Sequence, residues 1–425
     1  MVTITLPSSR MHRSALLALV LASGGVGVAL ATTMMSYLPA DDEVVLELLP
    51  LSRDAKVREL HQLRQTLTAQ PHDAALAADY ARRAIALGRS QSDPRFYGYA
   101  AAALAPWFVG DDGASNGATL APIGDKPADI VWLQATLMQQ RHDFDGAMHW
   151  LDALLQREEF GPARLTRASL LLVQGRQREA VRDCAALARH DVLAATTCGA
   201  LAASLDGRAA SALAALDTIM PQLDRAPVEQ RLWTLTLAAE IASRLDRTDE
   251  ATQRFERALA AMRSAGPDRD AYLLAAYADH LLDQGQPQAV AALLHDDMRV
   301  DGLLLRVAIA ERRLQQAGVA TPSLDLHRQQ LQARFDAVRL RGDTTHGREE
   351  AMFALHVESD ATRALSLALA NWQLQREPID ARLALEAANA AGEPAAAAPV
   401  RQWLRDHAIE DPLLQRLASP TPGNR

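Results

Sequence analysis

The sequence has 425 residues, of which 49% are hydrophobic, 23% charged and only 4% aromatic, and its formal net charge is −8. This length allows one to three ordinary domains or a single elongated repeat array. A negatively charged chain without a basic block is poorly suited to neutralising phosphates, which argues against a nucleic-acid-binding protein. The abundance of alanine, with few aromatic and β-branched residues, favours helices over strands.

The first forty residues have the composition of a targeting segment. Arg10 and Arg13 precede a stretch from residue 14 to residue 40 without charged side chains, which is typical of a secretory signal or an uncleaved signal anchor. The small residues around Ala31 favour cleavage after it, but the stretch approaches the roughly 20 residues that span a bilayer. We expect residues 1–40 to be a signal peptide or membrane anchor, and the following residues to lie outside the cytoplasm. A buried helix of a cytosolic domain is the alternative.

From residue 71 onward the pattern is a succession of helices with short breaks at Gly, Asp or Pro. Several segments share a small residue, then a Gly or Asp seven places later, then another small residue five places after that. These triplets are Ala168/Gly175/Ala180, Ala200/Gly207/Ala212, Ala239/Asp246/Ala251 and Ala278/Gly285/Val290, and Ala147, Ala364 and Ala397 mark the last position in further units. The spacings along Ala147, Ala180, Ala212, Ala251 and Val290 are 33, 32, 39 and 39 residues.

This pattern resembles the tetratricopeptide repeat, a helix pair of about 34 residues. The first small residue lets helix A approach its partner closely, the Gly or Asp turns the chain, and the second small residue lets helix B nest against helix A. The resemblance covers roughly residues 71–105 and 128–405. It implies an all-α fold, a right-handed superhelical solenoid of antiparallel helix pairs with about eight units, some of them irregular.

The same pattern divides the chain into regions. After residues 1–40 we expect a lead-in helix within 41–70, a first irregular repeat at 71–108, a loop rich in Gly, Pro and Asp at 109–128, regular repeats at 129–300, an irregular helical pair at 301–345, further repeats at 346–408 and a tail at 409–425. The density of helix-breaking residues predicts the loop, which is either a disordered spacer or a partner-contacting segment.

Motifs of the common enzyme classes are absent from the sequence, including those of zinc proteases, P-loop and dinucleotide-binding proteins and serine hydrolases. Residues 142–145 and 295–297 offer Asp and His but fall at turns, where these residues satisfy turn and cap hydrogen bonds. The titratable cluster at 343–350 is interpreted as a helix start, with a catalytic role as the alternative. We therefore expect a protein that is not an enzyme and that needs no metal or cofactor.

The two cysteines, Cys184 and Cys198, are too few for a zinc site and lack C-x-x-C spacing. In the repeat register Cys184 lies in helix B, four residues after Ala180, and Cys198 lies in the next helix A, two residues before Ala200. Facing residues of such a pair can approach the Cα separation of roughly 5.5 Å that a disulfide needs. A disulfide can therefore form in an oxidising compartment; the alternative is two small buried residues.

Helix A of each unit lines the concave surface in this family, so its inward positions are candidate binding residues. Those that carry more than Ala or Leu are Asp129, Trp132, Gln139, Trp233, Glu240, Tyr272, Asp279, His346, Glu349, Arg382 and Glu386. The family's clamp for a C-terminal carboxylate needs Lys and Asn at such places, and acidic or aromatic residues stand here instead. Exposed Trp and Tyr are typical interface anchors, although Trp132 and Trp233 have the alternative of packing between helices.

These observations predict an exported, non-enzymatic scaffold or adaptor of the bacterial cell envelope. Its concave groove would bind a protein or peptide partner, it would meet a membrane only through the N-terminal segment, and nucleic acid is not an expected partner. Two alternatives stay open: an enzyme or cofactor-maturation factor with an unrecognised site near residues 341–350, and a cytosolic regulator built from the same repeats.

Overall fold

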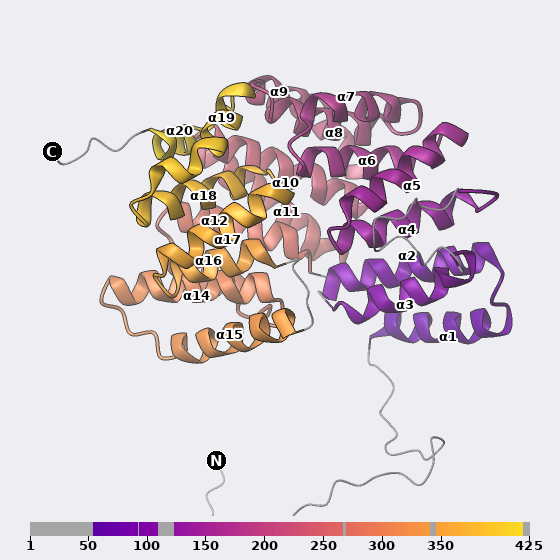
Figure 1. Cartoon of the computed structure of the whole chain (residues 1–425), viewed down its shortest axis with the longest axis horizontal. Coiled ribbons are helices and arrows are strands. Elements are labelled where there is room, and N and C mark those ends of the chain that lie inside the picture. The colour runs from indigo at the N-terminus through magenta and orange to yellow at the C-terminus, as the bar shows by residue number, and fades with distance from the viewer. Residues whose placement is uncertain (1–53, 92, 109–122, 267–268, 341–345, 420–425) are drawn as a thin grey trace, which may run out of the picture. The chain divides into compact units, whose positions relative to one another are not determined.

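The computed structural model describes residues 54–91, 93–108, 123–266, 269–340 and 346–419. The chain divides into two units, Met1–Leu51 and Ser52–Arg425, and every described residue belongs to the second. All regular secondary structure in this part of the chain is helical (Figure 1), which confirms the all-α fold. No helix among the described residues is long and apolar enough to cross a membrane. The segment predicted at 1–40 lies outside these residues.

The described residues form successive antiparallel helix pairs that stack into the predicted right-handed solenoid. A lead-in helix α1 (Ala55–Ala69) precedes nine pairs: α2 (Ala74–Gln91) with α3 (Arg95–Leu104), α4 (Ala128–Gln140) with α5 (Phe144–Arg157), α6 (Gly161–Val173) with α7 (Gln177–Ala186), α8 (Val192–Ser204) with α9 (Ala209–Ile219), α10 (Val228–Arg244) with α11 (Thr248–Ala265), α12 (Ala271–Asp283) with α13 (Pro287–Leu294), α14 (Asp301–Gln316) with α15 (Leu324–Leu340), α16 (Gly347–His356) with α17 (Ala361–Leu374), and α18 (Pro378–Ala390) with α19 (Ala398–Asp406). The repeat spacing predicts about eight units, so the array has one pair more.

The turn inside most pairs has one conformation. Seven residues that lie five places before the small residue of helix B have a left-handed backbone: His142 (φ 58°), Gly175 (76°), Gly207 (69°), Asp246 (61°), Gly285 (67°), Ser359 (59°) and Gly392 (71°). A left-handed residue directly after a helix is a common C-terminal cap. The sequence signal of a Gly or Asp at this position therefore reflects a backbone requirement of the turn.

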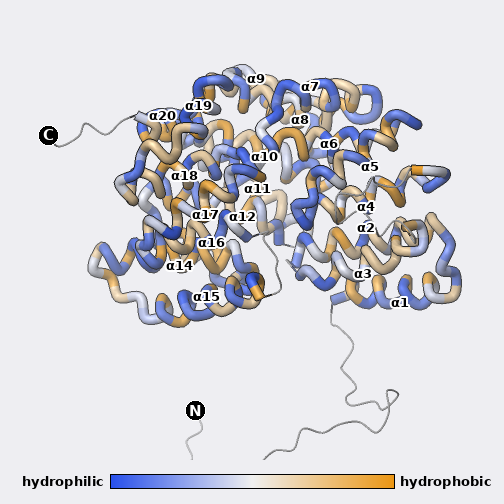
Figure 2. Tube along the Cα trace, viewed as in Figure 1, coloured by the Kyte–Doolittle hydropathy of each residue, from blue (hydrophilic) through white to orange (hydrophobic). Residues whose placement is uncertain are grey.

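The small residues of the repeat pattern are buried where helices cross. Ala168 and Ala180 have no exposed surface, and Ala239 and Ala251 likewise have none. Large side chains fill the next turn of helix B, as Phe255 does with 1% of its surface exposed. Each helix therefore alternates between hydrophobic and hydrophilic stretches along its length (Figure 2). The buried side chains form three clusters along the array, and partly buried residues such as Trp132 and Met148 lie between them. The largest cluster, which we call the main core, runs from Ala168 to Leu414.

The C-terminal end differs from the prediction of a tail at 409–425. Residues 412–418 form a further helix, α20 (Pro412–Ala418), which packs against α18. The Asp411 side chain accepts a hydrogen bond from the Leu414 amide at 3.0 Å, and Pro412 occupies the first turn. Leu414 is 1% exposed. An N-terminal cap followed by proline is a recognised helix start, and the tail prediction overlooked it. In the loop predicted at 109–128, helix α4 already begins at Ala128, and residues 109–122 lie outside the described residues.

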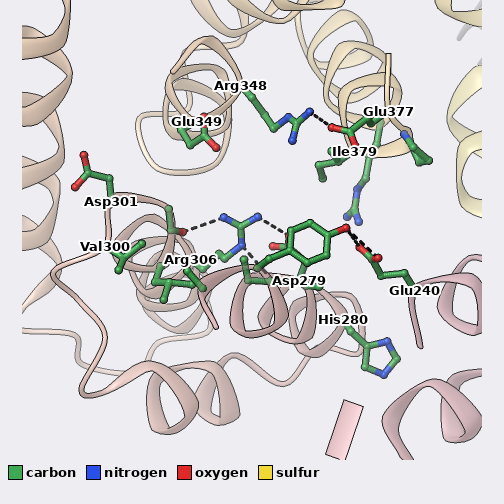
Figure 3. Close-up of a pocket in the computed structure, with 18 of the residues that line it drawn as sticks. Glu240, Asp279, His280, Val300, Asp301, Arg306, Arg348, Glu349, Glu377 and Ile379 are labelled. Carbon is green, nitrogen blue, oxygen red and sulfur yellow. Dashed lines mark hydrogen bonds and ion pairs between the residues drawn. The ribbon is translucent and has the colours of Figure 1, made fainter. Parts of the chain in front are cut away.

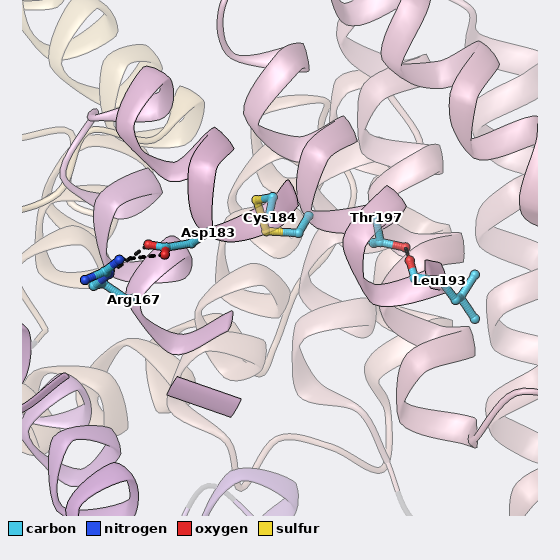
Figure 4. Close-up of a disulfide and its surroundings, with 6 residues drawn as sticks. Arg167, Asp183, Cys184, Leu193 and Thr197 are labelled. Carbon is cyan, nitrogen blue, oxygen red and sulfur yellow. Dashed lines mark hydrogen bonds and ion pairs between the residues drawn. A yellow bond between two sulfur atoms is a disulfide. The ribbon is translucent and has the colours of Figure 1, made fainter. Parts of the chain in front are cut away.

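The two cysteines are joined in the structure. Cys184 on α7 and Cys198 on α8 form a disulfide with a Cα–Cα distance of 5.3 Å (Figure 4). Beside it, the buried Asp183 accepts hydrogen bonds from Arg164 at 2.9 Å and from Arg167 at 2.7 and 2.8 Å. The geometry agrees with the adjacency of helix B and the next helix A that the repeat register predicts.

The end of the array returns to its middle. Turns and helix ends near residues 173–210, in α6–α9, contact Arg376 and residues 403–410, which lie between α17 and α20 (Figure 1). The Arg376 amide donates to the Val173 carbonyl at 2.7 Å, and Arg178 donates to the Asp406 carbonyl at 3.1 Å. We call this contact the seam. It closes the repeats from α6 to α20 into a ring around an internal space.

Candidate functional site

The internal space is a cavity of about 1340 Å³. Its walls come from the first helices of successive pairs, α10, α12, α14, α16 and α18, together with α20, the end of α8, the turn between α2 and α3, and the end of α4. Apolar side chains such as Leu303 and Ile379 alternate there with charged ones (Figure 3). A large concave space with a few convergent polar groups is the usual form of a ligand site.

Tyr272 and Glu240 form the central polar contact of this cavity. The Tyr272 hydroxyl donates to Glu240 Oε1 at 2.8 Å and lies 3.0 Å from Oε2. Burial raises the pKa of Glu240 to about 7, although the Tyr272 hydrogen bond and the charge of Arg244 act in the opposite direction. Tyr272 exposes 61% of its surface, and it does so as a residue of the cavity wall. An exposed aromatic ring therefore lies beside a carboxyl group whose pKa is raised by burial.

Arg306 and Asp279 connect α14 to α12. Arg306 donates to an Asp279 carboxylate oxygen at 2.6 Å and to the carbonyls of Gly302 at 2.9 Å and Ala275 at 3.3 Å. The three donors are Nε, Nη1 and Nη2 of the guanidinium group, and Arg306 as a whole is 7% exposed. The pair is thus fixed in the cavity wall (Figure 3).

Arg348 connects α16 to the start of α18. It donates to Glu377 at 2.5 Å and to both oxygens of the buried Asp380 at 2.6 and 2.8 Å. Burial works against the charge of Arg348, but Asp380 and Glu377 hold its pKa well above the ordinary value. The Asn371 side chain completes the shell of Asp380 at 2.8 Å.

Arg382 connects α18 to α12 in the adjoining part of the wall. It donates to the two oxygens of Asp283 at 2.7 Å each and to Glu386 at 2.8 Å. His356 lies 3.3 Å from the other Glu386 oxygen. Burial alone would raise the pKa of Glu386, but His356 and Arg382 lower it to about 2. Glu386 is therefore ionised at neutral pH, in contrast to Glu240.

His280 at the cavity wall is a structural residue. It is 3% exposed, and its two ring nitrogens lie 3.0 Å from Ser243 Oγ and 2.9 Å from Thr252 Oγ1. Burial lowers its pKa, so the ring is neutral. Both nitrogens are used, which leaves none for a ligand.

The structure gathers about half of the predicted groove residues at the cavity. Six of them line it: Glu240, Tyr272, Asp279, His346, Glu349 and Arg382. Glu386 lies behind Arg382 in a small adjoining space. The remaining four, Asp129, Trp132, Gln139 and Trp233, do not line it.

Those four residues make contacts between helices. The Trp132 indole donates to Thr166 Oγ1 at 2.9 Å and packs edge-on against Phe160. Asp129 pairs with Arg82 at 3.3 Å, Gln139 lies 3.4 Å from Ser169 Oγ, and Trp233 is half-buried against the main core. These contacts favour the alternative interpretation of the two tryptophans as packing residues, which stays a prediction.

Several cavity residues were not among the predicted ones. Arg306 is the clearest, since it is a lone charge within the apolar run 303–310 of α14, and such a charge signals either a buried ion pair or a site. Arg348 lies in the first turn of α16, and Glu377 directly precedes α18. The interpretation of residues 343–350 as a helix start did not single out Arg348 as a candidate. Nothing in the sequence links Arg244 on α10 to Asp411, whose charges interact across the cavity wall.

The motifs set aside in the sequence have structural roles where they are described. Asp143 caps α5 by accepting from the Gly146 amide at 3.0 Å, and Asp297 pairs with Arg269 at 2.5 Å. Glu350 is buried and pairs with Arg363 and Arg339. No group of three or more metal-ligating side chains occurs among the described residues. Residues 341–345 lie outside them.

Comparisons with known proteins assign no family. No protein-family model matches the sequence, and no curated protein matches it. A solved structure of Naa15/Naa10 bound to HypK-THB is similar at 16% identity with a TM-score of 0.22, and the match covers 85% of this chain and 63% of that chain. The chain thus spans less than two-thirds of that length. The TM-score is too low to support an inference, so the repeat architecture rests on the chain's own helices.

Proposed function

We propose that this protein is a non-enzymatic scaffold, built from helix pairs that resemble tetratricopeptide repeats, which holds a segment of a partner protein in the central cavity. The observation that supports this proposal is the cavity of about 1340 Å³, with the ring of Tyr272 free in its wall. Tyrosines in such positions are frequent binding anchors. The volume suits several residues of a peptide rather than a small ion.

The carboxyl group beside Tyr272 favours a basic side chain at that point of the cavity. Glu240 accepts from the Tyr272 hydroxyl and forms no ion pair among the described residues. A Lys or Arg side chain above the Tyr272 ring would gain a cation–π contact and the Glu240 carboxyl group as a partner. Glu349, across the cavity (Figure 3), is a second carboxylate without an ion pair among these residues. The arginines of the wall are either paired with carboxylates, as Arg306, Arg348 and Arg382 are, or form no ion pair among the described residues, as is the case for Arg89, Arg141, Arg244 and Arg416.

The experiment is a selection from a library of end-blocked heptapeptides on the immobilised protein. We expect enrichment of peptides with Lys or Arg, and loss of that enrichment in the double variant Glu240→Gln/Glu349→Gln and in Tyr272→Ala. Tyr99→Ala is the matched control, since Tyr99 is 41% exposed and does not line the cavity. Selection of no peptide, or of peptides without basic residues, contradicts the proposal.

The export of the protein is part of the same proposal and rests on residues 1–40. A fusion of residues 1–60 to a reporter that is active only outside the cytoplasm should be active, and the mass of the mature N-terminus distinguishes cleavage after Ala31 from a retained anchor. Activity of a cytoplasmic reporter instead would favour the cytosolic regulator.

A second candidate is an enzyme, which one observation favours. Glu240, with a pKa near 7 and a hydrogen bond from Tyr272, has the properties of a general acid or base. The candidate catalytic group would then be Glu240 rather than the cluster at 341–350. If Glu240→Gln keeps peptide binding but abolishes the biological activity of the protein, the enzyme becomes the better proposal.

A further inference from the structure

The seam joins parts of the chain that lie about two hundred residues apart in sequence. The Ala210 amide, in the first turn of α9, donates to Glu410 Oε2 at 3.2 Å. His407 Nδ1 lies 3.3 Å from Asp206 Oδ1, and Arg178 Nε donates to the same oxygen at 3.1 Å. The C-terminal segment thus supplies partners to helix ends that lack them within their own repeat.

The backbones approach closely at two left-handed glycines. A Cβ at Gly207 would lie 3.1 Å from Ala408 Cβ, and one at Gly175 would lie 3.1 Å from Arg376 Cβ and from Trp403 Nε1. That indole nitrogen is buried without a hydrogen-bond partner among the described residues. The fit is close, but one of its polar atoms is left unsatisfied.

The chemistry of the seam differs from that of the other contacts between pairs. Neighbouring pairs meet through buried Ala, Leu and Phe side chains. The seam consists mainly of hydrogen bonds and ion pairs between turns and helix ends: the Arg178 side chain is 69% exposed, those of His407 and Asp206 are 16% and 17% exposed, and Trp403 packs there against Gly175. Turns that meet through such polar contacts bury less apolar surface than packed helix faces do, so we expect the seam to be the weakest contact around the ring.

The seam also forms one wall of the cavity. Leu205, directly before the turn that contains Asp206 and Gly207, lines the cavity, and so do Asp411 and Leu413, directly after Glu410. Arg244 joins the two sides from within, since it donates to Ser204 Oγ at 2.9 Å and its charge interacts with Asp411. Separation of the seam therefore opens the cavity sideways.

We infer that the seam is a clasp, which opens while the repeats on either side stay folded and so admits a partner segment to the cavity. The opening itself does not depend on the proposed function; only its use for a partner does. Side entry allows an internal segment of a long partner chain to enter without threading an end through the ring.

Hydrogen exchange of the native protein tests the opening. The amides of Arg376 and Ala210 donate across the seam, whereas the amides of Arg247 and Gln286 donate within their own turns, to Ala242 and Leu281 at 2.9 Å each. We expect the first two amides to exchange about 10-fold faster or more than the second two, because local opening precedes unfolding. Equal rates would overturn the clasp.

A disulfide lock provides the second test. In Gly207→Cys/Ala408→Cys the two Cβ atoms start 3.1 Å apart and need to separate by a few tenths of an ångström. Asp246 occupies the position equivalent to Gly207 in the next pair with φ 61°, so a side chain is tolerated there. We expect the oxidised variant to slow exchange at Arg376 and Ala210 to the rate of the within-turn amides. Because reduction would also open the Cys184–Cys198 disulfide, the unlocked control is Gly207→Ser/Ala408→Ser, in which the two amides should keep their faster exchange.

Access at the seam is measured with a further cysteine at Leu205, which lines the cavity beside the seam and is 3% exposed. We expect a bulky maleimide to label Leu205→Cys at least about 10-fold more slowly when the lock is oxidised. Labelling should be faster in Arg178→Ala but not in Arg176→Ala, whose partner Glu179 lies three residues away in the first turn of α7. Leu326→Cys, on an exposed position of α15, controls for reagent reactivity. Labelling of Leu205→Cys that ignores the lock overturns the inference.

The heptapeptide selection separates this inference from the proposed function. Peptides that bind Gly207→Ser/Ala408→Ser but not the oxidised lock variant support both. A clasp that opens by exchange and labelling, in a protein that selects no basic peptide, supports the clasp and contradicts the proposed function. Binding of basic peptides at equal rates to both forms supports the function and overturns the clasp as the entrance.

Discussion

The Tyr272 hydroxyl lies within hydrogen-bonding distance of both oxygens of Glu240, at 2.8 and 3.0 Å, and yet Glu240 is the carboxyl group whose pKa rises to about 7. A hydrogen bond from a hydroxyl does not replace the water that burial removes from a carboxylate. The charges of Glu377 and Asp279 act in the same direction as burial. The cavity therefore holds one acidic group that is poised to ionise when a cation arrives.

Glu240→Gln should stabilise the protein above pH 7. Because the pKa of Glu240 is higher in the folded chain than its ordinary 4.5, the folded state binds the extra proton, and stability is lost as the pH rises from 4.5 through 7. The gap corresponds to at most about 3 kcal/mol at about 1.4 kcal/mol per pKa unit. Urea unfolding of both proteins at pH 4 and pH 8 measures the difference, which should be near zero at pH 4. A variant that is less stable than the native chain at pH 8 would contradict the raised pKa.

Glu386→Gln should have the opposite effect. The pKa of Glu386 is lowered from 4.5 to about 2, so its ionised form contributes stability above pH 4.5 that is lost as the pH falls toward 2. We expect the substitution to lower the free energy of unfolding by about 3 kcal/mol at pH 7 and by much less near pH 2. The same urea titrations serve, and Glu179→Gln is the control, because Glu179 pairs with Arg176 on an exposed surface. A loss at pH 7 no larger than that of the control would refute the role of His356 and Arg382.

The repeat core could be predicted from the sequence because it depends on local spacing. Ala180 and Ala251 are fully buried, as a helix crossing requires of a small residue, and the left-handed turn at Gly207 explains why Gly recurs at that place. The disulfide followed from the same register. Each of these features relates residues fewer than about forty places apart.

The seam and the ion pairs of the cavity could not be predicted in this way. His407 and Asp206 are polar residues on turns, and no periodicity relates positions 201 residues apart. Trp132 sits at an inward position of helix A but packs against Phe160, since the direction of one side chain depends on neighbours in the adjacent pair. Arg306 gave a signal, a charge in an apolar helix, but its partner Asp279 lies on another pair.

Trp132→Ala should behave as a core substitution. Removal of the ring leaves a space against Phe160 and takes away one of the two hydrogen bonds of the Thr166 hydroxyl, which still donates to the Pro162 carbonyl at 3.0 Å, so we expect a loss of about 3 kcal/mol in the free energy of unfolding. Trp132→Phe should recover most of it and lose about 1 kcal/mol with the indole hydrogen bond. Peptide affinity of the folded protein should not change. If affinity falls while stability is kept, Trp132 belongs to the binding surface after all.

The disulfide should be present in the exported protein. Unfolded without reductant, the chain should show no reactive thiol, since Cys184 and Cys198 are its only cysteines and are bonded. Reduction should lower the free energy of unfolding by about 3 kcal/mol, the loop-entropy value for a loop of this length. Ellman titration with and without dithiothreitol, followed by urea unfolding, gives both numbers. Two thiols per unreduced chain would show that the bond does not form.

Asp246→Gly should raise the stability of the protein. Asp246 has φ 61° in the turn between α10 and α11, where the four other pairs of the regular region have Gly or His, and a side chain in this conformation costs up to about 1 kcal/mol even for Asp. We expect a gain of about 0.5–1 kcal/mol in the free energy of unfolding, measured in urea.

Gly285→Ala is the reverse experiment. A Cβ at this position meets no atom within 4 Å, so the expected decrease of about 1 kcal/mol in the free energy of unfolding measures backbone strain alone. Asp249→Gly, in the first turn of α11, should instead destabilise by about 1 kcal/mol because glycine weakens a helix. If Asp246→Gly is destabilising while Gly285→Ala is also destabilising, the Asp246 carboxylate contributes a favourable interaction at the cavity wall that outweighs its backbone strain.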